Sequence, residues 1–159
     1  MVLAMPVPQI GEGYRGAEGH SGYLLRQAWN AFRDAMDAAL REHGLSSAQY
    51  AALSVLARDP GASGAELARA CNTTPQAMNG VLKMLERDRL VERSPHPTHG
   101  RILEARLTPE GDRRLAAATP AVRRLEQQIE LDLTPRQRAT VKSWLVATAQ
   151  RLGHDTRLG

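Results

Sequence analysis

The sequence predicts a mainly α-helical protein that carries one small β-hairpin. Over most of the chain, apolar residues recur at spacings of three and four, which is the periodicity of amphipathic helices. Between Leu90 and Thr108 the period changes to two, which is the periodicity of strands. The chain has 159 residues, of which 42% are hydrophobic and 24% charged. This is enough for a soluble domain with a real core.

The first expected helix runs from Ser21 to His43. Its apolar residues recur at helical spacing: Leu25, Ala28, Trp29, Phe32, Met36, Ala39 and Leu40. Gly44 follows as a stop, because glycine readily adopts the left-handed conformation that ends many helices. Residues 1–19 are rich in glycine and have little to bury, so we expect a flexible N-terminal arm there.

Each later helix begins at a hydroxyl residue, whose oxygen accepts the unpaired N–H groups of the first turn. The start residues are Ser46 with Gln49, Ser63 with Glu66, Thr74, Thr108 and Thr134. The two serine pairs have the spacing of capping boxes, and each threonine precedes a proline. Pro120 lies inside the fifth expected helix, so we expect that helix to kink or restart there.

The stretch of twofold periodicity divides into two short strands, "LVERS" from Leu90 and "RILEARL" ending at Leu107. In the second strand, alternation places three apolar residues on one face: Leu103, Ala105 and Leu107. Residues 95–100, "PHPTHG", are typical of a turn. A β-hairpin that projects from a helical body is therefore expected.

The two helices that precede the hairpin have the spacing of a helix-turn-helix. The segments "SGAELARAC" and "PQAMNGVLKMLERD" are separated by "NTT", a turn of suitable length. We expect an inward stripe formed by Met78, Val81, Leu82 and Leu85 against Leu67, Ala68 and Cys71. The second helix then leaves a polar face outside, formed by Gln76, Asn79, Gly80 and Lys83.

This polar face suits the major groove of DNA. Gln and Asn make bidentate contacts with adenine, Lys reaches guanine or phosphate, and Gly80 lets the helix lie close to the bases. Helix starts at Ser63, Thr73 and Thr74 add hydroxyls and N–H groups that favour phosphate. Periodicity alone is equally consistent with a face that only meets water. The hairpin that follows favours DNA, because it turns the helix-turn-helix into a winged one.

In this order and spacing, the elements resemble the MarR family of bacterial transcriptional regulators. The similarity covers about residues 21 to 152. Its most specific pieces are "ELARACNTTPQAMNGVLKMLERDRLVER", which is similar to the recognition-helix region of the family, and "LTPEG" after the wing. Each piece is a weak signal alone, whereas their combination is specific.

The resemblance implies a homodimer that binds a palindromic double-stranded DNA operator and regulates transcription as a repressor. Residues 20–45 and 109–153 would form the dimerisation region, residues 46–108 the winged helix-turn-helix domain, and residues 154–159 a tail. The recognition helix, residues 75–88, would enter the major groove, with its two copies about 34 Å apart. The expected DNA-binding set is Ser63, Thr73, Thr74, Pro75, Gln76, Asn79, Lys83, His99 and Arg101.

The expected wing, residues 94–101, departs from the family pattern. Family wings usually carry an Asp-Arg pair near the tip, where this chain has His99 and Gly100 followed by Arg101. We expect Arg101 to enter the minor groove, because arginine is drawn to the negative potential of a narrow groove. His99 could contact phosphate or base edges with a charge that depends on pH. A solvated loop is the alternative.

The resemblance also implies a small aromatic effector that releases the DNA. Trp29 and Phe32 of the first helix would line its pocket, although aromatics at helical spacing usually belong to a core. We expect Trp144 of the last helix at the dimer interface.

Composition points to a cytoplasmic protein that does not enter a membrane. No apolar run approaches the about 18 residues of a membrane span, and the N-terminal stretch lacks a basic leader and contains Pro6 and Pro8. The net charge of +4 and pI of 9.8 permit an anionic partner. Between Cys71 and Arg106, however, six Lys/Arg stand against four Asp/Glu, so placement matters more than bulk charge.

The sequence predicts no catalytic site, cofactor or metal centre. The single cysteine, Cys71, is expected to be a buried and inert thiol, rather than an oxidant sensor or the nucleophile of an alkyl-transfer enzyme. His96 and His99 are three residues apart, in a loop without a nearby carboxylate. The remaining alternative to DNA binding is a winged helix used only for protein contact, but such a surface needs apolar anchors in place of hydrogen-bonding residues.

Overall fold

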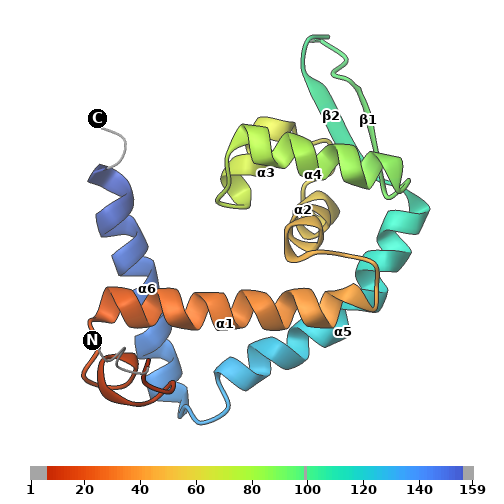
Figure 1. The fold of residues 1–159 in the computed structure, drawn as a ribbon. Coiled ribbons are helices and arrows are strands. Elements are labelled where there is room, and N and C mark those ends of the chain that lie inside the picture. The colour runs from red at the N-terminus through yellow and green to blue at the C-terminus, as the bar shows by residue number, and fades with distance from the viewer. Residues whose placement is uncertain (1–6, 99, 156–159) are drawn as a thin grey trace, which may run out of the picture. The chain divides into compact units, whose positions relative to one another are not determined.

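The structure is a computed structural model that describes residues 7–98 and 100–155. In chain order its elements are η1 (Gly13–Arg15), α1 (Ser21–Arg41), α2 (Ser47–Arg58), α3 (Gly64–Ala70), α4 (Pro75–Arg87), β1 (Val91–Pro95), β2 (Leu103–Leu107), α5 (Pro109–Ile129) and α6 (Pro135–Asp155). The predicted fold class is confirmed, because the described residues form helices and one antiparallel hairpin in the order of a winged helix-turn-helix (Figure 1). Residue contacts divide the chain into two units that meet in sequence between Val122 and Arg123.

The helix starts predicted at Ser46 and Ser63 are capping boxes. Ser46 Oγ accepts a hydrogen bond from Gln49 N at 3.2 Å, and Gln49 Oε1 accepts one from Ser46 N at 2.9 Å. Ser63 and Glu66 form the same pair of bonds at 3.3 and 2.8 Å. Thr74 caps α4 through a single bond of 3.1 Å. Each cap of this kind contributes about 1 kcal/mol to stability.

Three helices of the first unit end in the same way. Two or three residues after the last helical residue, one residue has a positive φ: 65° at Gly44, 50° at Asn72 and 57° at Arg89. In each case the next N–H bonds to the carbonyl five residues before it, at 3.2, 2.9 and 2.8 Å, which is a Schellman motif. Asn72 therefore sets the sharp turn of the helix-turn-helix, and Arg89 sets the turn from α4 into β1.

The core of the first unit lies where α1, α2, α3 and α4 meet. Its largest fully buried side chains are Leu40, Leu53, Leu56, Leu67, Met78, Leu82, Leu85 and Leu90. Burying one leucine of this size contributes about 1.5–3 kcal/mol. The predicted stripe between α3 and α4 is confirmed at its buried members, whereas Val81 and Cys71 at its edge are only half-buried.

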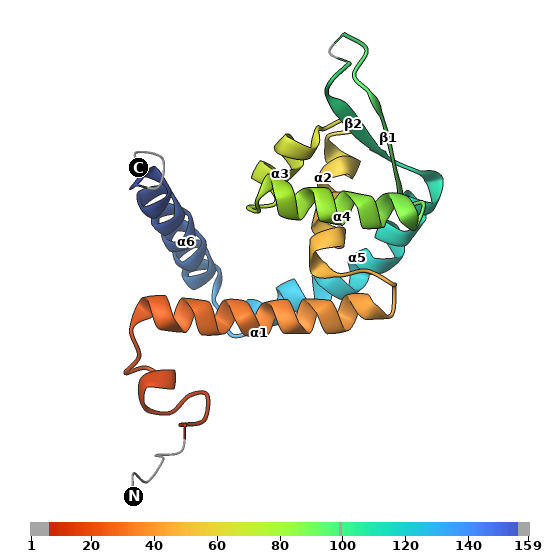
Figure 2. The same cartoon turned by 45° about the horizontal axis from the view of Figure 1, so that its top comes forward.

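The hairpin pairs Val91 with Leu107 at its inner end and Pro95 with Leu103 at its outer end. Ala105 and Leu107 face inward as predicted. Leu103 was expected to join them, but it is 42% exposed. Figures 1 and 2 show the reason, because the outer part of the hairpin extends past α3 and α4 and no helix covers it.

Helix α5 continues through Pro120, so of the two expected outcomes the restart is wrong and the kink stays a prediction. The missing N–H of Pro120 removes one bond to the carbonyl four residues earlier, at Ala116. Both residues are exposed, so water can satisfy that carbonyl. The residue before the proline, Thr119, donates from Oγ1 to Leu115 O at 2.8 Å, a side-chain bond of the kind that often bends helices.

The second unit contains the end of α5 and all of α6. Thr134 caps α6, accepting from Gln137 N at 3.3 Å. The helix exposes large apolar side chains, namely Val141, Trp144, Leu145, Val146 and Leu152. Within the described residues, no helix is both long and apolar enough for a membrane span.

The described part of the N-terminal segment, residues 7–19, contains η1 and is bonded to α1. Arg15 Nε donates to Gln27 Oε1 at 3.1 Å, and Gln27 Nε2 donates back to Arg15 O at 3.1 Å. A guanidinium nitrogen of Arg15 also donates to Pro8 O at 3.0 Å. The flexibility of residues 1–19 stays a prediction, as do the boundaries of the dimerisation and DNA-binding regions.

Candidate nucleic-acid interface

Helix α4 presents its polar face to solvent. Gln76, Asn79, Gly80 and Lys83 are all exposed, while Met78 and Leu82 on the opposite side are buried. No heavy atom lies within 4 Å of the position that a Cβ would take at Gly80. The fold does not require glycine there, so its small size matters only for whatever approaches α4 from outside.

The start of α4 is open, whereas the start of α3 is closed by a carboxylate. Thr73, Thr74 and Pro75 are exposed, and the Thr74 hydroxyl accepts one bond but keeps its proton free to donate. The Ser63 hydroxyl instead donates to Glu66 Oε2 at 2.8 Å. Hydrogen bonds from Ser63 lower the pKa of Glu66, so this carboxylate stays charged and disfavours phosphate at Ser63.

Two residues that the sequence did not single out connect α4 to β1. Arg93 of β1 forms an ion pair with Glu86 of α4 through one terminal nitrogen. Its other terminal nitrogen donates to Asn79 Oδ1 at 3.4 Å. Arg93 shares a strand face with Val91, which is buried, so the alternation of "LVERS" already indicated that this arginine points inward.

The wing is braced by its own side chains. His96 N donates to Ile102 O at 2.8 Å, and Thr98 N donates to His96 Nδ1 at 3.2 Å. The other nitrogen of this ring lies 3.4 Å from Glu104 Oε1, and Arg106 donates to Glu104 Oε2 at 3.0 Å. The expectation that no carboxylate is near His96 is therefore wrong. It missed Glu104 because the hairpin brings the two residues together across the strands.

Arg101 stands apart from this network. It is exposed, and its side chain makes no hydrogen bond or ion pair with any described residue. His99, the other wing residue of the predicted DNA-binding set, lies outside the described residues.

The cations of this region differ in how far they are neutralised. Ion pairs engage three of the six Lys/Arg residues between Cys71 and Arg106: Arg87 with Asp88, Arg93 with Glu86, and Arg106 with Glu104. Within the part of the chain that the structure describes, the side chains of Lys83, Arg89 and Arg101 have no such partner. Free positive charge is therefore available on α4, at its end and on the wing.

Cys71 is half-buried at the end of α3, not fully buried as predicted. Burial raises the pKa of its thiol, and Arg58 opposes this only in part. A raised pKa keeps the sulfur protonated at neutral pH, and the protonated thiol is a poor nucleophile. No group of three His, Cys, Asp or Glu side chains in residues 7–98 and 100–155 is arranged to hold a metal ion.

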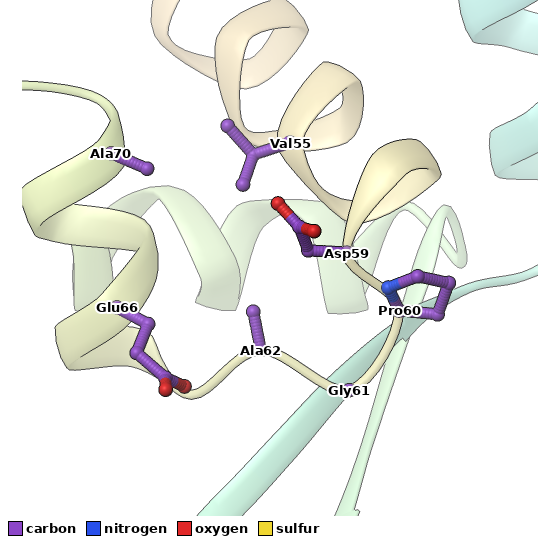
Figure 3. Close-up of a pocket in the computed structure, with 7 residues that line it drawn as sticks. All are labelled: Val55, Asp59, Pro60, Gly61, Ala62, Glu66 and Ala70. Atoms are coloured by element: carbon purple, nitrogen blue, oxygen red, sulfur yellow. The ribbon is translucent and has the colours of Figure 1, made fainter.

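The predicted effector residues lie on one exposed side of α1. Trp29 is 58% exposed and its ring lies 6.2 Å from that of Phe32, which is half-buried. Two hollows of this unit lie elsewhere. One, of about 460 Å³, lies between the end of α2 and α3, and Figure 3 shows the carboxylates of Asp59 and Glu66 on its wall. These charges disfavour an anionic ligand there.

The other hollow, of about 500 Å³, lies between the N-terminal segment and α1. Two cations, Arg15 and Arg26, and one carboxylate, Asp34, line it, and the Arg26 guanidinium lies 5.6 Å from the centre of the Tyr23 ring.

Comparison with known proteins identifies relatives of this arrangement. A sequence model of the MarR family matches residues 43–102. The HTH-type transcriptional repressor Rv2887 of Mycobacterium tuberculosis is 37% identical over 134 residues, which cover 84% of this chain and 94% of that protein.

Solved structures agree with this result. The M. tuberculosis MarR family protein Rv2887 in complex with salicylic acid has a TM-score of 0.63 and 36% identity, covering 81% of this chain and 96% of the other. A mutant MarR from E. coli complexed with operator DNA has a TM-score of 0.75 and 22% identity, covering 80% and 91%, and supports the fold alone.

Proposed function

The chain belongs to the MarR family of DNA-binding transcriptional regulators, and from this membership we propose that it represses transcription with α4 in the major groove and the wing in the minor groove of its operator. One observation supports this most directly. The exposed polar residues of α4 and Arg101 of the wing, which has no ion-pair partner among the described residues, belong to two elements that Arg93 and Glu86 join.

Each interface residue has a role that follows from its chemistry. Gln76, Asn79 and Lys83 contact base edges, because amide and ammonium groups match the hydrogen-bonding pattern of the major groove. Thr73, Thr74 and Pro75 place the start of α4 against a phosphate, where free N–H groups and the helix dipole favour negative charge. Ser63 acts mainly as the cap of α3, since its proton is already donated to Glu66.

The wing supplies a second contact. Arg101 enters the minor groove, and His99 contacts the adjacent backbone. The bonds of His96 with Ile102 and Thr98 hold the loop that carries Arg101, so this wing does not need the Asp-Arg pair that is usual in the family.

A homodimer presents two copies of this interface to a palindromic site. Its contacts use the apolar residues that α6 exposes, with Trp144 at 48% exposure among them. A single chain would leave this apolar surface in water, whereas a partner helix would bury it.

A small aromatic acid releases the DNA in this proposal. The relative Rv2887 was solved with salicylic acid, which makes that acid the first compound to test. Trp29 and Phe32 line the proposed pocket once a partner covers this side of α1. Salicylic acid should raise the melting temperature of the original protein. If Trp29→Ala abolishes this rise, the pocket at Trp29 is supported; if the rise is unchanged, the hollow lined by Arg15 and Arg26 becomes the better candidate.

The DNA-binding proposal is tested by a titration of the purified protein against DNA that flanks its own gene, at two salt concentrations. Affinity for one palindromic fragment should fall steeply with salt, because each neutralised phosphate releases counterions. Asn79→Ala should weaken that binding, whereas Asn30→Ala, at an exposed asparagine of α1, should not.

Two results would contradict the proposal. If the affinity for DNA does not change with salt, the protein does not neutralise phosphates. A winged helix that contacts another protein is then the better interpretation. If Asn79→Ala and Asn30→Ala bind DNA selected from a random pool as well as the original protein, α4 does not read bases.

A further inference from the structure

The amide oxygen of Asn79 is engaged by a side chain of β1. Its oxygen lies 3.4 Å from a terminal nitrogen of Arg93, and the other terminal nitrogen of the same guanidinium pairs with Glu86. Guanidinium groups carry only donors, so the amide must turn its oxygen toward Arg93 and its NH₂ group away from it. The guanidinium donors therefore determine which end of the amide faces Arg93.

The arginine that holds the amide is itself well fixed. The Arg93 side chain is 17% exposed, and its Nε is buried without a hydrogen-bond partner. Arg93 pairs in register with Ala105, which is fully buried, so its strand position faces the protein. Glu86 lies two helical turns after Asn79 on the same side of α4, which lets one planar guanidinium contact both.

A bidentate contact with adenine needs the amide oxygen as well as the NH₂ group, because adenine offers one acceptor and one donor in the major groove. Guanine and thymine offer a carbonyl oxygen where adenine and cytosine offer an amino group. An asparagine that presents only its NH₂ group therefore finds a partner on guanine or thymine. On cytosine it meets only a second donor, and on adenine N7 alone can accept, beside the N6 amino group that opposes the NH₂.

We propose that Arg93 is a positioning residue that determines base specificity: held by Glu86, it keeps the Asn79 oxygen turned inward, so that Asn79 selects guanine or thymine over adenine at its position in the operator. This inference rests on the proposed function, in which α4 lies in the major groove. It replaces the bidentate adenine contact that the residue type alone predicts for Asn79.

The test is selection from random double-stranded DNA with the full-length protein and three variants. Asn79→Ala identifies the operator position that Asn79 reads, because preference should disappear at that position alone. The unchanged protein should prefer guanine or thymine there by about tenfold. Arg93→Met frees the amide oxygen and should move the preference at this position to adenine.

Arg87→Met is the matched control. It removes the same charge from the same region, but Arg87 is exposed, pairs with its neighbour Asp88 and does not contact Asn79. It should lower affinity for all sites alike and leave every base preference unchanged. Thermal unfolding checks that each variant is folded. If Arg93→Met does not fold, Glu86→Gln replaces it in the test. This variant weakens the ion pair that holds Arg93, so it should shift the base preference at the Asn79 position in the same direction by a smaller factor.

The outcomes separate this inference from the proposed function. If the unchanged protein selects no sequence at all, both fail. If it selects an operator in which adenine is preferred at the Asn79 position, or in which folded Arg93→Met or Glu86→Gln keeps the original preference, the protein still reads DNA and only the role of Arg93 is overturned.

Discussion

We predict that the fold requires glycine at position 111, because the backbone at the start of α5 lies against the backbone that follows α4. A Cβ at this position would lie 2.0 Å from Leu90 O and 3.0 Å from Leu90 C. Carbon and oxygen atoms approach to about 3.3 Å, so the two backbones would have to separate by roughly 1.3 Å in Gly111→Ala.

The surrounding hydrogen bonds resist that separation. Thr108 N donates to Leu90 O at 3.0 Å, and Thr108 Oγ1 donates to Arg89 O at 2.7 Å. Gly111 N in turn donates to Thr108 Oγ1 at 3.0 Å. Overpacking costs about 1–3 kcal/mol, and we take the upper end because the atom that Cβ meets belongs to the backbone. Alanine regains about 1 kcal/mol of helix propensity, which leaves a net loss of about 2 kcal/mol.

Thermal unfolding at a fixed protein concentration measures this loss. For a chain of this size, about 2 kcal/mol corresponds to a decrease in Tm of roughly 4–8 °C. Gly80→Ala is the matched control, since Gly80 is also helical but has open space where its Cβ would lie. It should raise Tm by about 2–4 °C. If Gly111→Ala is as stable as the original protein, the close approach to Leu90 does not constrain the fold.

Three further predictions concern a cap, a carboxylate and the wing. Thr74→Ala should lower the free energy of unfolding by about 1 kcal/mol in urea titrations and Thr74→Ser should not, because only the alanine removes the oxygen that accepts from Ala77 N. The backbone hydrogen bond from Ser47, followed by the side-chain one, lowers the pKa of Asp37 below its ordinary value of 3.8. Its contribution to stability is thus present above that pH and lost as the pH falls through the lowered pKa. Asp37→Asn should therefore be less stable than the original protein at pH 7, and the difference should shrink as the pH falls below 3.8; a difference that does not change with pH would contradict this. Arg101→Ala should weaken binding to operators with A·T pairs beneath the wing, measured at moderate salt, and unchanged affinity would remove Arg101 from the minor groove.

The helix starts could be predicted from the sequence because a cap involves residues only three positions apart. Ser46 and Ser63 mark the starts of their helices, because their side chains form hydrogen bonds with backbone N–H groups of the first turn. The end of α4 could not be predicted in this way. Arginine rarely adopts a positive φ, and Arg89 does so because the chain must turn there to bring Leu90 into the core.

Contacts between distant segments explain the remaining differences. The requirement for Gly111 depends on Leu90, which lies 21 positions earlier, so the motif "LTPEG" could be linked to the family but not to a physical cause. The polar face of α4 was predicted correctly as exposed, whereas the engagement of Asn79 by Arg93 depends on how β1 packs on α4. The sequence predicted Trp144 at the dimer interface, and in a single chain this residue is 48% exposed.

Leu90 and Arg93 connect α4, the wing and the start of α5. The Leu90 N–H closes the end of α4, its carbonyl accepts from the start of α5, and its side chain is fully buried. Three residues later, Arg93 connects β1 to the middle of α4 through Glu86 and Asn79. Two separate attachments along one short strand prevent the wing from rotating against α4. A shift at the start of α5 should therefore displace α4 and the wing together. In the proposed function, an effector that acts through α5 would change the distance between the two copies of α4 in the dimer without changing which bases each copy reads.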